Sequence, residues 1–248
     1  VYDRAVQMKP CNIGVQGICC KNCSMGPCRL PLPKGGIEGE DTRKGLCGAT
    51  ANTIAARNFI RMIAGGAAAH SDHGRCVAEV FLSAARKETE AYKIKDVNKL
   101  VQVAESIGIE TEDRSVKEIA TDLYEELERT YTQVEGEIPF AKRVPQGTLD
   151  TWRKLGIVPR GAMREIMELM HRSTMGVDQH YENITKQCNR TALADGWGGS
   201  MLATDLQDVL FGTPYPLQSE ANLGVLKEDH VNLVIHGHEP VLSEIIVA

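Results

Sequence analysis

Apolar residues recur every three or four positions through the middle of the chain, from about Thr50 to Phe211, so this region is predicted to be helical. Helices are expected over residues 50–64, 67–87, 115–129, 159–171, 178–194 and 205–211. The third helix begins at Ser115, which forms a capping box with Glu118. Gly212 follows the last helix and is a typical C-terminal stop signal.

Both ends of the chain differ from this helical region. Residues 1–48 are dense in Gly, Pro and Cys, so they bury little apolar surface, and bound metal is expected to hold this segment in place. Near the other end, Val231–Ile235 is a β-branched run that predicts a strand, and Pro240 suits the first turn of a helix after it. A strand, a tight loop and a helix together are typical of the opening of a parallel α/β domain.

Three segments are therefore expected: a Cys-rich segment over 1–48, a helical domain over 49–212, and the start of a Rossmann-like α/β domain over 213–248. The predicted fold class is a mainly α N-terminal domain with a Cys-rich segment, followed by the start of a Rossmann-like parallel α/β domain. Because the chain begins at Val1 and ends in an element after the predicted strand, we expect it to be a piece of a longer polypeptide.

Composition and charge limit the classes of partner. The 248 residues are 42% hydrophobic and 25% charged, as in an average globular protein. A net charge of −5 argues against a nucleic-acid or anionic-membrane partner, because both favour concentrated positive charge. No apolar run reaches the roughly 18–20 residues of a membrane span. With no secretory signal ahead of the cysteines, we expect a reducing, cytoplasmic setting.

The cysteines carry the strongest functional signal. Six of the eight lie in the first 47 residues, namely Cys11, Cys19, Cys20, Cys23, Cys28 and Cys47. Adjacent cysteines do not both point easily into one small site, so Cys19 and Cys20 indicate two sites that meet there. The last four cysteines form a complete four-thiolate set. Cys11 and Cys19 form half a set, which implies that a partner chain supplies the other half.

Four thiolates can hold either zinc or an iron–sulfur cluster, and ligand type alone leaves both alternatives open. Two features favour iron and sulfur. Small and apolar residues surround the ligands, so backbone N–H groups can approach the cluster, and only Cys20 and Cys23 have the CxxC spacing that zinc fingers use in pairs. A disulfide framework is disfavoured, since a chain of this size does not need one. The isolated Cys76 and Cys188 are expected to be small buried hydrophobes.

Two pairs of histidines are further candidates. His70 and His73 lie three positions apart on one helix face, where they are either ordinary surface histidines or a proton relay. His236 and His238 flank a glycine at the end of the predicted strand, where a metal or substrate ligand would fit.

Long segments in the first third of the chain read PCNIGVQGICCKNCSMGPCR, GLCGATANTIAARN and GGAAAHSDHG. Later segments read MELMHRSTMGVD, TDLQDVLFGTP and SEANLGVLKEDHVNLVIHGHEPVLSEIIV. In this order they resemble the anaerobic nickel–iron–sulfur carbon monoxide dehydrogenases, essentially from end to end of this chain. The resemblance covers only the N-terminal part of that family's catalytic polypeptide.

The resemblance implies three metal clusters. The family's B cluster, a [4Fe–4S] cluster within one subunit, would be ligated by Cys20, Cys23, Cys28 and Cys47. Cys11 and Cys19 would provide half the ligands of the D cluster, an intersubunit [4Fe–4S] cluster on the two-fold axis of a homodimer. His238 would bind an iron of the Ni–Fe–S C cluster, whose cysteine ligands come later in the family's sequence.

The activity implied by the resemblance is the reversible oxidation of CO with water to CO2, two protons and two electrons. The electrons would pass through the B and D clusters to a ferredoxin-like acceptor. His70 and His73 would match the start of a histidine series that carries protons away, and Cys76 and Glu79 stand where that series continues in some members. Many members also associate with an acetyl-CoA synthase subunit.

Two rival interpretations remain. A hybrid-cluster or hydroxylamine reductase has a similar architecture. Such proteins lack a cysteine pair like Cys19 and Cys20 and also lack the HGHEP segment that this chain contains. The other rival is a non-catalytic electron-transfer or zinc-stabilised interaction fragment, because the cysteine ligands of the C cluster are not among these residues.

Overall fold

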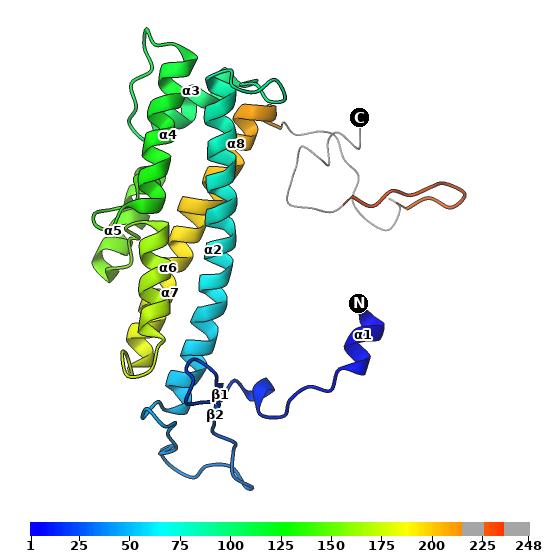
Figure 1. Cartoon of the computed structure of the whole chain (residues 1–248), viewed down its shortest axis with the longest axis vertical. Coiled ribbons are helices and arrows are strands. Elements are labelled where there is room, and N and C mark those ends of the chain that lie inside the picture. The colour runs from blue at the N-terminus through cyan, green and yellow to red at the C-terminus, as the bar shows by residue number, and fades with distance from the viewer. Residues whose placement is uncertain (215–225, 236–248) are drawn as a thin grey trace.

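The computed structural model describes residues 1–214 and 226–235. Its body is an elongated helical bundle built on one long helix, α2 (Ala51–Ala85) (Figure 1). The other α-helices are α1 (Tyr2–Gln7), α3 (Val97–Ser106), α4 (Val116–Thr132), α5 (Gln146–Leu155), α6 (Ala162–Arg172), α7 (Tyr181–Asp195) and α8 (Met201–Phe211). Short 3-10 helices cover Gly14–Gln16 and Pro139–Arg143, and a π-helical turn, Gly196–Ser200, joins α7 to α8.

Helix α2 is continuous, whereas the sequence pattern predicted two helices that part near Gly65 and Gly66. It begins at Thr50, whose side chain accepts a hydrogen bond of 3.2 Å from the backbone N–H of Thr53. Each interior glycine disfavours a helix by about 1 kcal/mol relative to alanine. The helix persists because its N-terminal half packs on α6 and α7 and its C-terminal half packs on α4 and α8.

Most of the other predicted helices are found, with ends that differ by a few residues. The capping box at the start of α4 is confirmed, with the Ser115 N–H donating to the Glu118 carboxylate at 2.8 Å. Helix α8 ends at Gly212, whose φ of 107° is one that favours glycine. Helices α3 and α5 were not predicted, since each spans only 10 residues and buries few apolar side chains.

A small apolar cluster attaches the Cys-rich segment to the bundle. Ile18 and Leu30 from that segment pack with Ala49 and Ile54 at the first turn of α2. The buried Cys20 belongs to the same cluster. The largest core lies elsewhere, around the C-terminal half of α2. The Cys-rich segment therefore has only a small apolar core of its own.

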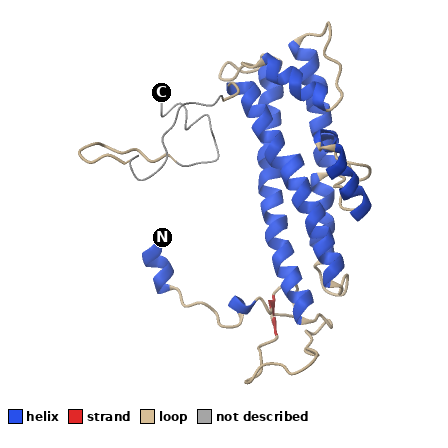
Figure 2. Cartoon of the chain, turned by 180° about the vertical axis from the view of Figure 1, so that it is seen from behind, coloured by secondary structure: helices blue, strands red, loops and turns tan. Residues whose placement is uncertain are grey.

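That segment also has little regular structure. Strands β1 (Cys19–Cys20) and β2 (Cys28–Arg29) form an antiparallel pair in which Cys20 lies opposite Cys28. Ahead of β1 the chain runs out from the bundle to α1, none of whose residues is buried (Figures 1 and 2). The strand pair thus lies at the foot of α2, between the extended N-terminal arm and the bundle (Figure 2).

The strand predicted over Val231–Ile235 is not formed in the structure. Val231, Leu233 and Val234 are exposed to solvent, and Val231 is 99% exposed. A strand needs a neighbouring backbone for its hydrogen bonds, and no second strand lies beside this segment in the part of the chain that the structure describes. His236, His238 and Pro240 lie outside the described residues. No helix within residues 1–214 and 226–235 is both long enough and apolar enough to cross a membrane.

Candidate metal centre

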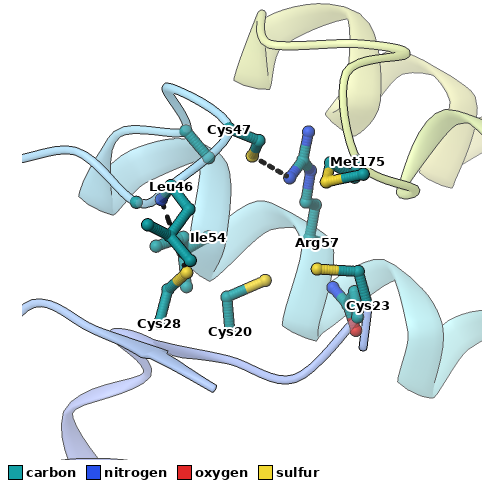
Figure 3. A pocket seen from close by; sticks show the side chains of 11 residues that line it. Cys20, Cys23, Cys28, Leu46, Cys47, Ile54, Arg57 and Met175 are labelled. Atoms are coloured by element: carbon teal, nitrogen blue, oxygen red, sulfur yellow. Dashed lines mark hydrogen bonds between the residues drawn. The ribbon is translucent and has the colours of Figure 1, made fainter. Parts of the chain in front are cut away.

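Four cysteines surround one cavity at the foot of α2 (Figure 3). The cavity is lined by the side chains of Cys20, Cys23, Cys28 and Cys47. The sulfur atoms come from two separate stretches of chain, the β1–β2 region and the loop that precedes α2. The structure therefore brings together the complete four-thiolate set that the spacing predicted.

The strand pair positions two of these cysteines directly. The register of β1 and β2 pairs Cys20 with Cys28, so both side chains lie on the same face of the pair. Cys23 lies on the connection between the strands, and Cys47 lies on the loop that leads to the N-cap of α2. Successive side chains of a strand point to opposite faces, so Cys19 cannot share the cavity with Cys20.

Two glycines allow the chain to approach the cysteines closely. A Cβ on Gly26 would lie 3.1 Å from the carbonyl oxygen of Cys20 and 3.2 Å from the nitrogen of Cys28. A Cβ on Gly45 would lie 3.5 Å from the Cys28 sulfur. The backbone N–H of Leu46, next to Gly45, donates to that sulfur at 3.4 Å. Backbone donors aimed at cysteine sulfurs are typical of iron–sulfur sites, where they adjust the reduction potential.

Positive charge reaches the cavity through Arg57, on the second turn of α2. Its Nη1 donates to the Cys47 sulfur at 3.6 Å (Figure 3). Burial raises the pKa of the Cys47 thiol, but hydrogen bonds from Arg57, the Ala49 backbone and Gln179 outweigh it, so the pKa lies below its ordinary value. A lowered pKa favours the thiolate, which is the form of cysteine that binds metal.

Two buried N–H donors in the cavity wall lack hydrogen-bond acceptors, and a bound cluster would supply them. Asn22 Nδ2 and Arg57 Nε are buried and have no hydrogen-bond acceptor. Such atoms are costly unless an acceptor is present, and cluster sulfurs would provide one. Among residues 1–214 and 226–235, no three His, Cys, Asp or Glu side chains gather tightly enough to hold a single ion. The four thiols and the two unpartnered donors of the cavity wall therefore fit an iron–sulfur cluster.

Cys11 and Cys19 lie apart from this cavity. Cys11 is exposed on the N-terminal arm, and Cys19 is half-buried on the other face of β1. The Gly14 N–H donates to the Cys11 sulfur at 3.4 Å, and the backbone N–H groups of Gly14 and Ile13 lower the pKa of this thiol. Two sites that separate at the adjacent cysteines were expected, and the single chain keeps the two sets apart.

The histidine pair lies on the exposed side of α2. His70 Nδ1 lies 2.8 Å from Asp195 Oδ1, at the end of α7. His73 is exposed one turn further along, with Cys76 and Glu79 on the same side of the helix. Cys76 is therefore not the buried hydrophobe that was expected.

Cys188 is buried, as expected for a small hydrophobe. It packs on α7 against Ile60, Ala64, Leu169 and Ile184. Burial raises the pKa of its thiol, which disfavours the metal-binding thiolate.

Comparison with known proteins shows which family the chain belongs to. The model of the Prismane/CO dehydrogenase family matches residues 18–248. The chain belongs to this family. Carbon monoxide dehydrogenase 1 of Methanosarcina acetivorans is 51% identical to it over 248 residues, which are 99% of this chain and 38% of that protein. The carbon monoxide dehydrogenase/acetyl-CoA synthase subunit beta of Moorella thermoacetica is 42% identical, covering 99% of this chain and 36% of its own length.

Solved structures of the family have the same fold. A Ni-free carbon monoxide dehydrogenase from Thermococcus sp. AM4 aligns with a TM-score of 0.84 and 48% identity, over 100% of this chain and 39% of that chain. An acetyl-CoA synthase/carbon monoxide dehydrogenase with NiZn[Fe4S4] and NiNi[Fe4S4] clusters aligns with a TM-score of 0.83 and 41% identity, over 36% of its length. The chain thus spans less than two-fifths of these carbon monoxide dehydrogenases.

Sequence reasoning missed three polar residues in this family member: Asn22, Arg57 and Asp195. Arg57 could have been noticed, because it follows Ile54 by three positions and precedes Ile60 by three, within the apolar stripe of α2. A charged residue at such an inward-facing position is unusual unless it has a partner. Nothing in the local pattern around Asn22 or Asp195 distinguishes them from ordinary polar residues.

Proposed function

We propose that this chain is part of an anaerobic carbon monoxide dehydrogenase, an oxidoreductase that interconverts CO and CO2. The four-cysteine cavity is the observation that carries this proposal, since its thiols and unpartnered N–H donors suit an iron–sulfur cluster. The names of its relatives, carbon monoxide dehydrogenases, indicate the reaction. The acceptor we propose is a ferredoxin-like protein, in the cytoplasm of an anaerobic cell.

The proposed B cluster is a [4Fe–4S] cluster held by Cys20, Cys23, Cys28 and Cys47. Cys11 and Cys19 would share the D cluster with the same residues of a second subunit, which makes the protein a homodimer. The exposure of Cys11 and the half-exposure of Cys19 support this, because a shared ligand must be reachable from outside its own chain. His238 would bind an iron of the Ni–Fe–S C cluster. When bound, these clusters supply the redox chemistry and take up the two electrons that CO releases.

His70 and His73 are the proposed proton carriers. Asp195 accepts the hydrogen on His70 Nδ1, so Nε2 is left to take up a proton from the reaction. His73 lies one turn along the same exposed side of α2, which would extend the route toward solvent. Imidazole suits this role because it gains and loses protons near neutral pH.

Two finer proposals concern organisation and partners. The domain division is 1–48, 49–212 and 213–248, with the last segment opening a Rossmann-like α/β domain that neighbouring strands would complete. An acetyl-CoA synthase subunit is the proposed protein partner, because two relatives are named as parts of acetyl-CoA synthase complexes. No nucleic-acid partner is proposed, because the chain carries a net charge of −5.

Metal analysis of the anaerobically purified full-length protein tests the proposal. One cluster per chain and half of a shared one predict about 6 Fe, apart from the iron and nickel of the C cluster. Cys23→Ser should lose about 4 Fe, Cys19→Ser about 2, and the control Cys76→Ser none. CO-dependent reduction of a dye should accompany the intact clusters. Stoichiometric zinc without sulfide, or full clusters without CO oxidation, would contradict the proposal.

A further inference from the structure

Arg57 is the most deeply buried charged side chain beside the cavity. It is 1% exposed, yet none of the ion pairs found in residues 1–214 and 226–235 involves it. Its acceptors are the Cys47 sulfur and the backbone carbonyl of Asp178, at 3.6 Å and 2.8 Å. A buried guanidinium without a carboxylate partner is costly. Of these two acceptors, only the Cys47 sulfur can carry a negative charge.

The surrounding chain holds Arg57 in one position. Asp178, whose carbonyl accepts from Arg57 Nη2, is itself fixed through its carboxylate by Arg172 Nη1 at 3.0 Å. The next residue, Gln179, accepts from Thr53 Oγ1 at 2.7 Å through its backbone and donates to the Cys47 carbonyl at 3.0 Å through its side chain. The loop before α7 therefore clamps both the arginine and the cysteine that it contacts.

We propose that Arg57 sets the reduction potential of the four-cysteine cluster. Four thiolates give such a cluster a net negative charge, and each added electron makes it more negative. A fixed positive charge stabilises the reduced state more than the oxidised state, so Arg57 raises the potential and favours electron uptake by this cluster. Asn22 acts in the same direction as a neutral donor, through its unpartnered Nδ2. Arg57 acts through the cysteine that it contacts, so it is a positioning residue. This inference rests on the iron–sulfur cluster proposed above.

Arg61 provides a matched control one turn further along α2. Its Nε donates to Ser173 Oγ at 3.0 Å, so it also links α2 to the connection between α6 and α7. It does not line the cavity, and Arg57 does. Replacing Arg61 removes one positive charge and one contact between these elements without changing the cavity wall. The low dielectric of a buried site makes a nearby charge count for much more than a distant one.

The test is a redox titration of the full-length holoenzyme, followed by electron paramagnetic resonance. The signal of the four-cysteine cluster is identified as the one that Cys23→Ser loses. Arg57→Gln should shift its midpoint potential to a clearly more negative value with iron and sulfide retained. Arg57→Lys, which keeps the charge, and Arg61→Gln should leave the midpoint at the wild-type value.

Several other results of this titration would overturn the proposal. An unshifted midpoint in Arg57→Gln with full iron content overturns the role of Arg57, and so does an equal shift in Arg61→Gln. If Arg57→Gln assembles no cluster, Arg57→Lys decides, because a clearly more negative midpoint in that variant excludes charge as the cause. Absence of any iron–sulfur signal in the wild-type protein overturns the proposed function itself.

Discussion

His70 Nδ1 lies 2.8 Å from Asp195 Oδ1, and this contact joins the middle of α2 to the last residue of α7. A carboxylate only accepts hydrogen bonds, so the imidazole carries its hydrogen on Nδ1 and leaves Nε2 as the acceptor. The contact is close because Gly199, in the π-helical turn after Asp195, lets that turn approach the backbone of α2. A Cβ on Gly199 would lie 3.1 Å from the backbone carbon of His70.

Replacement of His70 should slow the proposed reaction by removing the proton acceptor. We expect His70→Gln to lower CO oxidation by about 100-fold and Asp195→Asn by about 10-fold, since Asp195 only orients the ring. His171→Gln, which changes an exposed histidine on α6, should have no effect. The measurement is dye reduction by the full-length enzyme, with metal content checked in each variant. Equal activity in all three variants would exclude His70 from proton transfer.

Substitution of Gly26 should impair the metal centre without changing any ligand. Its Cβ would lie 3.1 Å from Cys20 O, a backbone atom that cannot swing aside. We expect Gly26→Ala to lose most of the about 4 Fe of this cluster, because the loop must shift and carry its cysteines with it. Gly147→Ala is the control, since its Cβ would meet no atom within 4 Å. Iron and sulfide analysis decides, and full iron content in Gly26→Ala would contradict the close approach.

Helix α2 carries two kinds of glycine, which predict opposite effects on stability. A Cβ on Gly66 would lie in open space, whereas one on Gly74 would lie 2.7 Å from Tyr131 Oη and 3.3 Å from Gly199 O. Gly66→Ala should raise the free energy of unfolding by about 1 kcal/mol through helix propensity. Gly74→Ala should lower it by about 1–3 kcal/mol through overpacking. Urea unfolding of the isolated chain measures both, and a loss of stability in Gly66→Ala would show that something covers this face.

Glu168 predicts a pH-dependent contribution to stability. It accepts hydrogen bonds from Arg160 at 2.6 Å and from Arg172 at 3.0 Å. Burial raises the pKa of this carboxyl, but the two arginines outweigh it, so the pKa lies below its ordinary value of 4.5. A lowered pKa in the folded state stabilises the fold above the ordinary value, and this stabilisation is lost as the pH falls through the folded value.

Glu168→Gln should therefore cost about 2 kcal/mol of unfolding free energy near pH 7. The difference from the wild-type chain should be smaller at about pH 3 than at pH 7, because the Glu168 carboxyl takes up a proton as the pH falls below 4.5 and through its lowered pKa. Glu125→Gln, at an exposed position of α4, is the control and should stay within about 0.5 kcal/mol at either pH. Urea titrations at the two pH values make the comparison. A cost in Glu168→Gln that is the same at both pH values would contradict an ionic origin.

Local features of the sequence predicted much of this arrangement. The capping box at Ser115 and the stop at Gly212 were read correctly, because capping depends on residues only a few positions apart. The grouping of Cys20 and Cys23 with Cys28 and Cys47 was also expected, since four thiolates at such spacing suit one site. These inferences need no knowledge of how distant segments pack.

Local features misled where packing decided the outcome. The pair Gly65 and Gly66 suggested a break, but contacts of both halves of α2 with other helices keep it continuous. Val231–Ile235 has the composition of a strand, yet a strand exists only beside a partner, and the described residues supply none. The first residues of α6 and α7 were placed three residues early for a related reason, since helix propensity does not fix where a loop must turn.

By itself, then, the sequence determined which cysteines could form a set, where most of the helical region lies and which family the chain resembles, because spacing and periodicity are local properties. The tertiary structure alone decided that Arg57 lines the four-cysteine cavity and that Asp195 accepts a hydrogen bond from His70. Arg57 and Asp178 are 121 residues apart, and His70 and Asp195 are 125 apart. Contacts at such separations arise from the packing of α2 against α6 and α7, which no local pattern encodes.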